Sequence, residues 1–186
     1  MTKRSILQRK RIFIGGEGES EQSFIKWLYD LSNQECLHVH LHCQPLGGGG
    51  YRTMLDRAVC ARRREERDRT KFKSSVLLVD GDRAARGDDG WTIDQLKQEA
   101  SKQRFAVCVQ NPNFEGLLIR MLTPGREKLQ LEPVDVQRQL RALWPDYQKA
   151  ADAQMLESKF SLNDLLRVAS VDQALKSLLM MIGFSL

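Results

Sequence analysis

Residues 11–21 read RIFIGGEGESE, an apolar β-rich run that ends in two glycines and three alternating glutamates. Behind this run, Phe24, Trp27, Leu28 and Leu31 recur at the spacing of one face of an α-helix. A strand that passes directly into an amphipathic helix is typical of proteins in which strands and helices alternate. The stretch therefore predicts the first strand and the first helix of an α/β fold.

The same alternation continues along the chain. An apolar stripe within residues 54–59 predicts a second helix, and Thr92 with Gln95 forms a capping box that predicts the start of a third. Such alternation favours a parallel sheet covered by helices. We expect an α/β fold with a parallel four-stranded sheet flanked by helices, whose strands lie at Arg11–Gly15, His38–Cys43, Ser75–Asp80 and Phe105–Gln110.

The rest of the chain is predicted to be helical. After Phe114 prolines punctuate the pattern, and Ser170 with Gln173 predicts the start of the last helix. We expect three parts: a basic N-terminal tail over residues 1–10, an α/β core over 11–125, and C-terminal helices over 126–186 packed on that core.

Charge is unevenly distributed along the chain. The 29 lysines and arginines exceed the 24 acidic residues by five. The first eleven residues contain five basic residues and no acid, so residues 12–186 carry 24 groups of each sign. The folded body is therefore neutral overall, and the basic excess indicates a polyanionic partner without identifying it.

Several classes of protein are excluded. No window approaches 18 consecutive apolar residues, and no apolar stretch of signal-peptide length follows the first basic residues, so we expect neither a membrane span nor a secretory signal. The four cysteines show no zinc-binding spacing. Reduced thiols in a cytoplasmic protein are the simplest interpretation.

Acidic residues follow the first and third strands and the fourth. Ligands of open α/β sheets bind beyond the carboxyl ends of the strands, so these residues are expected at the functional edge. Side chains two apart on a strand share a face, which lets two of the aspartates converge. The edge would carry up to six carboxylates: Glu17, Glu19, Glu21, Asp80, Asp82 and Glu115.

So many carboxylates require neutralisation. Two unit charges about 4 Å apart repel by about 4 kcal/mol at an effective dielectric near 20. Some must be protonated, or a cation must bind, and oxygen ligands without histidine or cysteine select Mg²⁺ or Mn²⁺. The chemistry this predicts is metal-assisted phosphoryl transfer or phosphodiester cleavage.

Structural roles remain as alternatives for some of these residues. Glu21 falls in the first turn of a helix, where the helix dipole favours an acid in any case. The pair Asp80 and Asp82 could cap a loop entry. Asn111 and Pro112 have the pattern of a helix N-cap followed by proline at the first helical position.

Two further patterns are open to two interpretations. His38, His40 and His42 alternate on one strand, which suits either a transition-metal site or a half-exposed strand. The segment 57–73 contains eight basic residues, which form either a solvated helix face or a track for phosphate groups. The candidate nucleic-acid-binding residues are Arg62, Arg63, Arg64, Arg67 and Arg83.

Three motifs together resemble a known family. An apolar strand ending in Glu-Gly, followed by a D-x-D strand end at Asp80–Asp82, is similar to the Toprim domain of topoisomerases, primases and OLD-type nucleases. With E-G-x-x-E at Glu17–Glu21 and N-P-x-F-E at Asn111–Glu115, the set resembles the RloB-like Toprim family. The resemblance covers roughly residues 11–122, and this chain departs from the family in its extra Glu19 and its Gly15-Gly16 pair.

The resemblance implies a Rossmann-like fold and assigns roles to the motif residues. Glu17 would be the general acid/base, with Asp80 and Asp82 as the other catalytic residues. Metal binding would involve Glu17, Asp80, Asp82, Glu21 and Glu115, and the supporting residues would be Gly18, Asn111 and Pro112.

The expected function is Mg²⁺- or Mn²⁺-dependent phosphodiester cleavage of DNA or RNA by a cytoplasmic nuclease, in prokaryotic defence against phage or mobile elements. The alternative is a non-catalytic subunit that binds or senses nucleic acid for an AAA/ABC-type ATPase partner. A topoisomerase or primase activity is a third interpretation. The partners we expect are nucleic acid, that ATPase and a second copy of the chain in a homodimer, with no membrane.

Overall fold

The computed structural model describes residues 8–67, 69–82, 90–149 and 152–186. Within these residues four strands form one parallel sheet in the order β2-β1-β3-β4. The strands are β1 (Lys10–Gly16), β2 (Val39–Pro45), β3 (Ser74–Asp80) and β4 (Ala106–Gln110). The predicted α/β fold with a parallel four-stranded sheet is therefore confirmed, and each predicted strand lies within two residues of an observed one.

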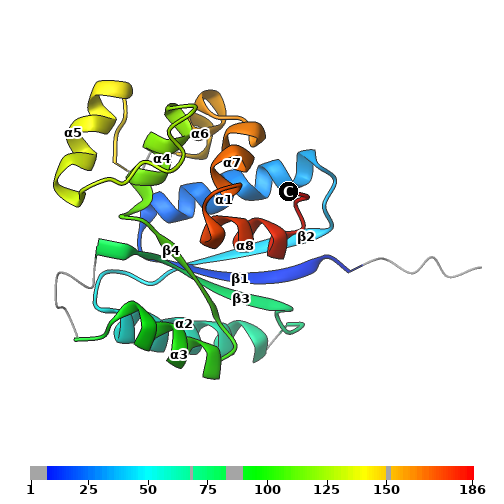
Figure 1. The fold of residues 1–186 in the computed structure, drawn as a ribbon. Coiled ribbons are helices and arrows are strands. Elements are labelled where there is room, and N and C mark those ends of the chain that lie inside the picture. Colours follow the sequence, from blue (N-terminus) through cyan, green and yellow to red (C-terminus); the bar gives the residue numbers. More distant parts are fainter. Residues whose placement is uncertain (1–7, 68, 83–89, 150–151) are drawn as a thin grey trace, which may run out of the picture.

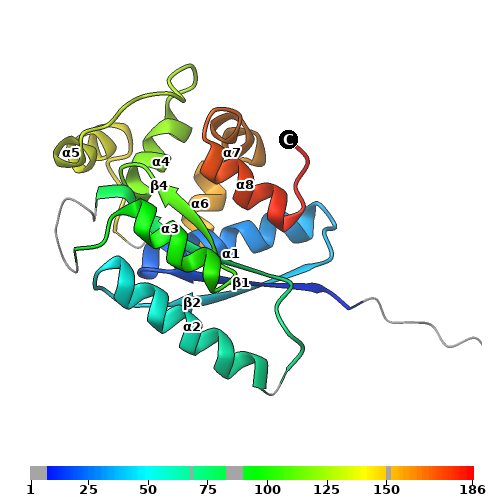
Figure 2. The same ribbon diagram turned by 60° about the horizontal axis from the view of Figure 1, so that its bottom comes forward.

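Helices cover both faces of the sheet (Figures 1 and 2). One face carries α2 (Tyr51–Arg67) and α3 (Ile93–Lys102). The other carries α1 (Glu19–Gln34) and the C-terminal helices, which are α4 (Phe114–Leu122), α5 (Pro133–Leu143), α6 (Ala153–Lys159), α7 (Leu162–Ala169) and α8 (Gln173–Ile182).

The strands are apolar on both sides because both faces are covered. Ile12 and Ile14 of β1 belong to the core formed with α1 and the C-terminal helices, whereas Phe13 between them belongs to the core formed with α2 and α3. In β3, Val76 and Leu78 alternate with Leu77 and Val79 in the same way. A continuous apolar run thus supplies two separate cores.

The helix signals were partly correct. The stripe Phe24, Trp27, Leu28 and Leu31 is buried on α1, and the Thr92 capping box begins α3 as predicted. The last helix is present, but its predicted start was wrong by two residues, because the N-cap of α8 is Asp172, whose carboxylate accepts the Leu175 N–H at 3.0 Å. Ser170 instead ends α7.

None of the described helices is both long and apolar enough to cross a membrane. All four cysteines are free, and Cys108 is buried beneath the C-terminal helices.

Candidate functional site

Acidic residues from three separate segments line one pocket at the carboxyl edge of the sheet. The pocket has a volume of about 360 Å³. Its acids come from the β1–α1 turn, the end of β3 and the first turn of α4. They are Glu17, Glu19, Glu21, Asp80 and Glu115. The structure thus brings together five of the six carboxylates that the sequence placed at this edge.

The β1–α1 turn holds Glu21 inside the pocket wall. Glu21 is only 5% exposed, and its Oε2 accepts the backbone N–H of Gly18, the N-cap of α1, at 2.9 Å. A Cβ at Gly16 would lie 2.6 Å from the Cβ of Glu21. The missing side chain at Gly16 therefore lets this glutamate pack against the end of β1, which gives this glycine before the motif a physical role.

Asp80 is fixed at the end of β3 by two neighbouring elements. The phenol of Tyr51, the first residue of α2, donates to the Asp80 backbone oxygen at 2.8 Å. The backbone N–H of Phe114, the first residue of α4, donates to the Asp80 carboxylate. Among the described residues, the buried Asp80 Oδ1 has no hydrogen-bond partner. One carboxylate oxygen is thus held in the site with ligand-binding capacity to spare.

Burial and like charges act together on this cluster. The pKa of Asp80 is raised to about 7, first by burial and then by repulsion from Glu21, Asp82 and Glu115. Burial also raises the pKa of Glu21, with a further contribution from Glu115. Without a cation, Asp80 and Glu21 therefore keep their protons at a pH at which ordinary carboxylates have released them.

Asp82 lies close to the pocket but outside its lining. Residues 81 and 82 form a tight turn after β3, and the Asp82 N–H donates to the Pro112 carbonyl at 3.0 Å. The turn takes Asp82 off the strand, so the sharing of one strand face with Asp80 does not hold. Asp82 still lies near enough to raise the pKa of Asp80.

The N-P-x-F-E segment forms the turn between β4 and α4. The Asn111-Pro112 peptide bond is cis, and Asn113 is the N-cap, accepting the Gly116 N–H at 3.1 Å. The interpretation of Asn111 and Pro112 as N-cap and first helical residue was therefore wrong by two positions. Pro112 instead packs against Gly116, where a Cβ would lie 2.7 Å from its Cδ.

Glu115 is 6% exposed and meets residues that sequence reasoning missed. Tyr147, in the chain between α5 and α6, lies with its phenol 3.5 Å from Glu115 Oε1. Burial and the Glu115 charge raise the pKa of this phenol. Among the described residues that line the pocket, Lys149 is the one cation, and its charge acts against the raised pKa of Glu21. No periodicity or motif around residues 147–149 marks them.

The residues present fit Mg²⁺. Among the residues described, no group of three or more His, Cys, Asp or Glu side chains is placed so that it could hold a metal ion. Mg²⁺ does not require one, because it is usually held by one or two carboxylates and keeps waters or phosphate oxygens as its other ligands. The buried Asp80 Oδ1 and the all-oxygen lining of acids match that preference.

Four of the five candidate nucleic-acid-binding arginines lie away from the acidic pocket. They occupy the last two turns of α2, a helix of 17 residues and thus roughly 25 Å long, whose first residue touches Asp80. Arg62 is engaged in the fold, with Nη1 3.3 Å from Ser75 Oγ and its guanidinium over the Phe105 ring. The other three are exposed: Arg63, Arg64 and Arg67. Arg83 lies outside the described residues.

The histidine pattern belongs to packing at the sheet edge. His42 stacks on Phe13 and lies against Phe72, with ring centroids 5.7 and 5.5 Å apart, and burial lowers its pKa. His40 meets the Tyr29 ring edge-on, and its pKa is also lowered by burial. These contacts favour the half-exposed strand over a metal site.

The fold and the pocket define an α/β protein with an acidic site at the carboxyl edge of a parallel sheet. Compared with protein-family models, curated proteins and solved structures, the chain shows no match.

Proposed function

We propose that the protein is a Mg²⁺- or Mn²⁺-dependent nuclease that hydrolyses a phosphodiester bond in nucleic acid. The observation that carries the proposal is the pocket in which Asp80, with its buried and unpartnered Oδ1, shares the lining with four other carboxylates. Such a cluster is unfavourable for folding and becomes favourable when a cation binds. The resemblance to RloB-like Toprim proteins supports the same activity, in a cytoplasmic defence role.

The residues divide between metal binding and proton transfer. Asp80 would hold Mg²⁺ with one of its buried neighbours, Glu21 or Glu115. Asp82, which lies outside the lining, would add negative charge near the bound cation. A bound Mg²⁺ polarises the phosphate and stabilises the charge that develops on its oxygens. Glu17 is half-buried in the lining, where its carboxylate can accept a proton from the attacking water and return one to the leaving oxygen.

Lys149 contributes from the exposed side of the pocket. Its side chain is exposed and lines the same space as the carboxylates. An ammonium group placed there attracts a phosphate that the acids alone would repel. This cation gives the C-terminal part of the chain a role in binding the substrate.

The experiment is a cleavage assay on end-labelled single-stranded, duplex and hairpin DNA and RNA with Mg²⁺, Mn²⁺ or EDTA. We expect metal-dependent cleavage that falls by at least about 100-fold in both Glu17→Gln and Asp80→Asn. The matched control is Glu35→Gln, an exposed acid at the other end of α1 and outside the pocket lining, with cleavage within about threefold of wild type. If both site variants cleave like wild type, the proposal is wrong. If wild type binds nucleic acid but neither binds Mg²⁺ in calorimetry nor cleaves, the non-catalytic subunit replaces it.

A further inference from the structure

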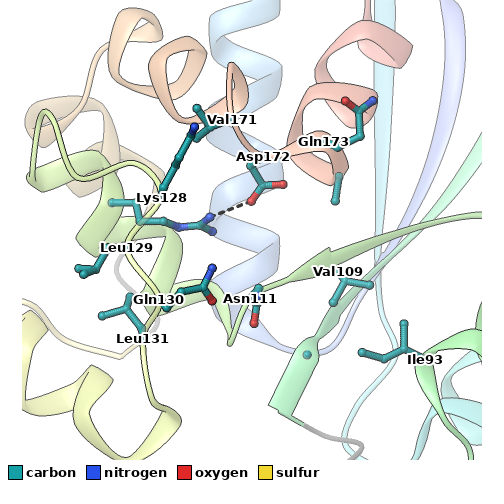
Figure 3. A pocket seen from close by; sticks show the side chains of 13 residues that line it. Ile93, Val109, Asn111, Lys128, Leu129, Gln130, Leu131, Val171, Asp172 and Gln173 are labelled. Carbon is teal, nitrogen blue, oxygen red and sulfur yellow. Dashed lines mark hydrogen bonds and ion pairs between the residues drawn. The ribbon is translucent and has the colours of Figure 1, made fainter.

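A second pocket lies beside the turn that carries Asn111 (Figure 3). It has a volume of about 520 Å³, within the range of small-molecule sites. Its lining comes from the turn after β3, the first residue of α3, the end of β4 with the turn after it, α4, the chain at residues 128–131, and residues 171–174 at the start of α8.

A buried ion pair forms part of the lining of this second pocket. Arg120 Nη1 donates to Asp172 Oδ2 at 3.0 Å, with the two side chains only 9% and 12% exposed. Arg120 Nε lies 3.4 Å from the Gly116 carbonyl, and Asp172 also caps α8. The pair joins α4 to the N-cap of α8. Charged side chains that are held in place by buried hydrogen bonds are a feature of a built binding site.

An unpartnered buried amide adds a second, independent observation. Gln110 is 5% exposed, and neither its Oε1 nor its Nε2 has a hydrogen-bond partner among the described residues. Gln110 lines a narrow recess that shares Val109, Arg120 and Asp172 with the second pocket. A buried amide left unpaired costs about 1–3 kcal/mol. The recess has a volume of about 10 Å³, so the partner that fits it is a single water between this amide and a ligand in the second pocket.

The lining indicates the class of ligand. Ile93 and Val109 form an apolar wall on the sheet side, and Leu129 and Leu131 form another on the loop side (Figure 3). Amides of Asn111 and Gln130 lie between these walls and can donate and accept hydrogen bonds. Lys128 adds an exposed ammonium. Apolar walls, amide groups and a cation suit a heterocyclic base joined to a phosphate.

We infer that the second pocket binds one unstacked nucleotide of the substrate strand, next to the phosphate that is cleaved; this inference rests on the proposed nuclease function. The link is the D-G-D turn, since Asp80 lines the acidic pocket while the adjoining Gly81 lines the second one. Two sites joined by consecutive residues can hold consecutive parts of one strand. Binding of the base then sets which phosphate reaches Asp80.

The first arm of the test measures nucleotide binding without metal or cleavage, so it is independent of the proposed activity. AMP, GMP, CMP and UMP are titrated into the ¹⁵N-labelled full chain, with ribose 5-phosphate and inorganic phosphate as base-free probes. We expect at least one mononucleotide to shift the side-chain amides of Asn111 and Gln130, and the base-free probes to bind about tenfold more weakly. If no nucleotide binds better than ribose 5-phosphate, the inference is wrong.

Variants place the bound nucleotide. Gln130→Ala should weaken its binding by about 3- to 10-fold, and Leu131→Trp, which fills the space between the walls, by more than about tenfold. Gln137→Ala, an exposed glutamine on α5 outside the pocket, is the matched control and should leave affinity unchanged. Equal affinities in all three variants would overturn the assignment to this pocket.

The second arm separates a nucleotide of the strand from a free nucleotide. Oligonucleotides with one abasic site, moved position by position, are cleaved by wild type and by Leu131→Trp. We expect kcat/KM of wild type to fall by about tenfold or more for one abasic position beside the cleaved bond, and this difference to disappear in Leu131→Trp. Mononucleotide binding combined with cleavage that is indifferent to every abasic position would identify a free nucleotide as the ligand and contradict the inference.

Discussion

The phenol of Tyr51 donates a 2.8 Å hydrogen bond to the backbone oxygen of Asp80, and so ties the start of α2 to the residue at the centre of the acidic pocket. Tyr51 is 2% exposed, so its hydroxyl has this partner in place of bulk water. Through this bond, helix α2 on one face of the sheet helps to fix Asp80, whose carboxylate belongs to the acidic pocket at the edge of the sheet.

Tyr51→Phe removes that hydroxyl and leaves the ring in place. We expect the free energy of unfolding to fall by about 1–2 kcal/mol, because a buried carbonyl loses its partner. Mg²⁺ affinity in calorimetry should fall as well, because Asp80 loses one of its supports. Tyr29→Phe is the control, since its hydroxyl accepts a bond from the exposed Arg9, and it should change stability by less than about 0.5 kcal/mol. Equal losses in the two variants would show that the Tyr51 bond has no special role.

Gly16→Ala tests the close approach of Glu21 to β1. The added Cβ would lie 2.6 Å from the Glu21 Cβ, so the turn between β1 and α1 must shift. We expect a loss of about 1–3 kcal/mol in urea denaturation, together with weaker metal binding. Gly48→Ala is the matched change, because nothing lies within 4 Å of its added Cβ and its effect should stay below about 1 kcal/mol. A fully stable Gly16→Ala protein with normal Mg²⁺ binding would refute this role.

The raised pKa of Asp80 predicts a pH dependence of stability with a definite sign. Its folded pKa of about 7 lies above the ordinary value of 3.8, so between these values the folded protein binds more protons than the unfolded chain. Stability from this group is therefore lost as pH rises from about 4 to about 7. Asp80→Asn removes the penalty, so without metal its advantage over wild type should grow with pH, reaching at most about 4 kcal/mol.

Urea denaturation in EDTA at pH 4, 6 and 8 measures that advantage. Asp94→Asn, whose side chain is 95% exposed, is the control for a change in net charge. Added Mg²⁺ should stabilise wild type at pH 8 and leave Asp80→Asn unaffected, because a ligand of the folded state raises its stability. A difference between wild type and Asp80→Asn that is the same at every pH would show that Asp80 is not perturbed.

The ion pair beneath the second pocket predicts a large stability loss. Asp172→Ala removes the N-cap of α8 and leaves Arg120 as a buried unpaired charge, so unfolding should become easier by about 3–5 kcal/mol. Asp152→Ala removes a comparable N-cap from α6 without leaving a buried arginine unpaired, so it should cost only about 1 kcal/mol. Thermal denaturation of both variants measures the difference, and similar losses would show that the pair adds nothing beyond the cap.

The sequence was sufficient for the fold because the signals were local. Runs such as SVLLVD allow both faces of a strand to be buried, and the Thr92 capping box marks a helix start by its own hydrogen bonds. The helix start after Asn111 was misplaced because Asn113 has equal capping chemistry two residues later. Local chemistry alone does not choose between two such caps.

The site was predictable only in part. Glu17, Glu21, Asp80 and Glu115 follow strand ends, and the parallel sheet brings strand ends together. Tyr147 and Lys149 reach the pocket through the packing of helices after α4, which no spacing in the sequence encodes. Asp82 does not share a face with Asp80 because β3 ends at Asp80 and the chain turns at Gly81. Residues two apart point to the same face only within a continuous strand.

We propose that the acidic pocket binds a divalent cation through Asp80. The most direct measurement is the anomalous diffraction of crystals grown with Mn²⁺, which behaves as Mg²⁺ toward oxygen ligands. We expect one strong anomalous peak within about 2.3 Å of Asp80 Oδ1, and its absence in Asp80→Asn crystals grown in the same way. A pocket without an anomalous peak at saturating Mn²⁺, or a peak that persists in Asp80→Asn, would contradict the claim.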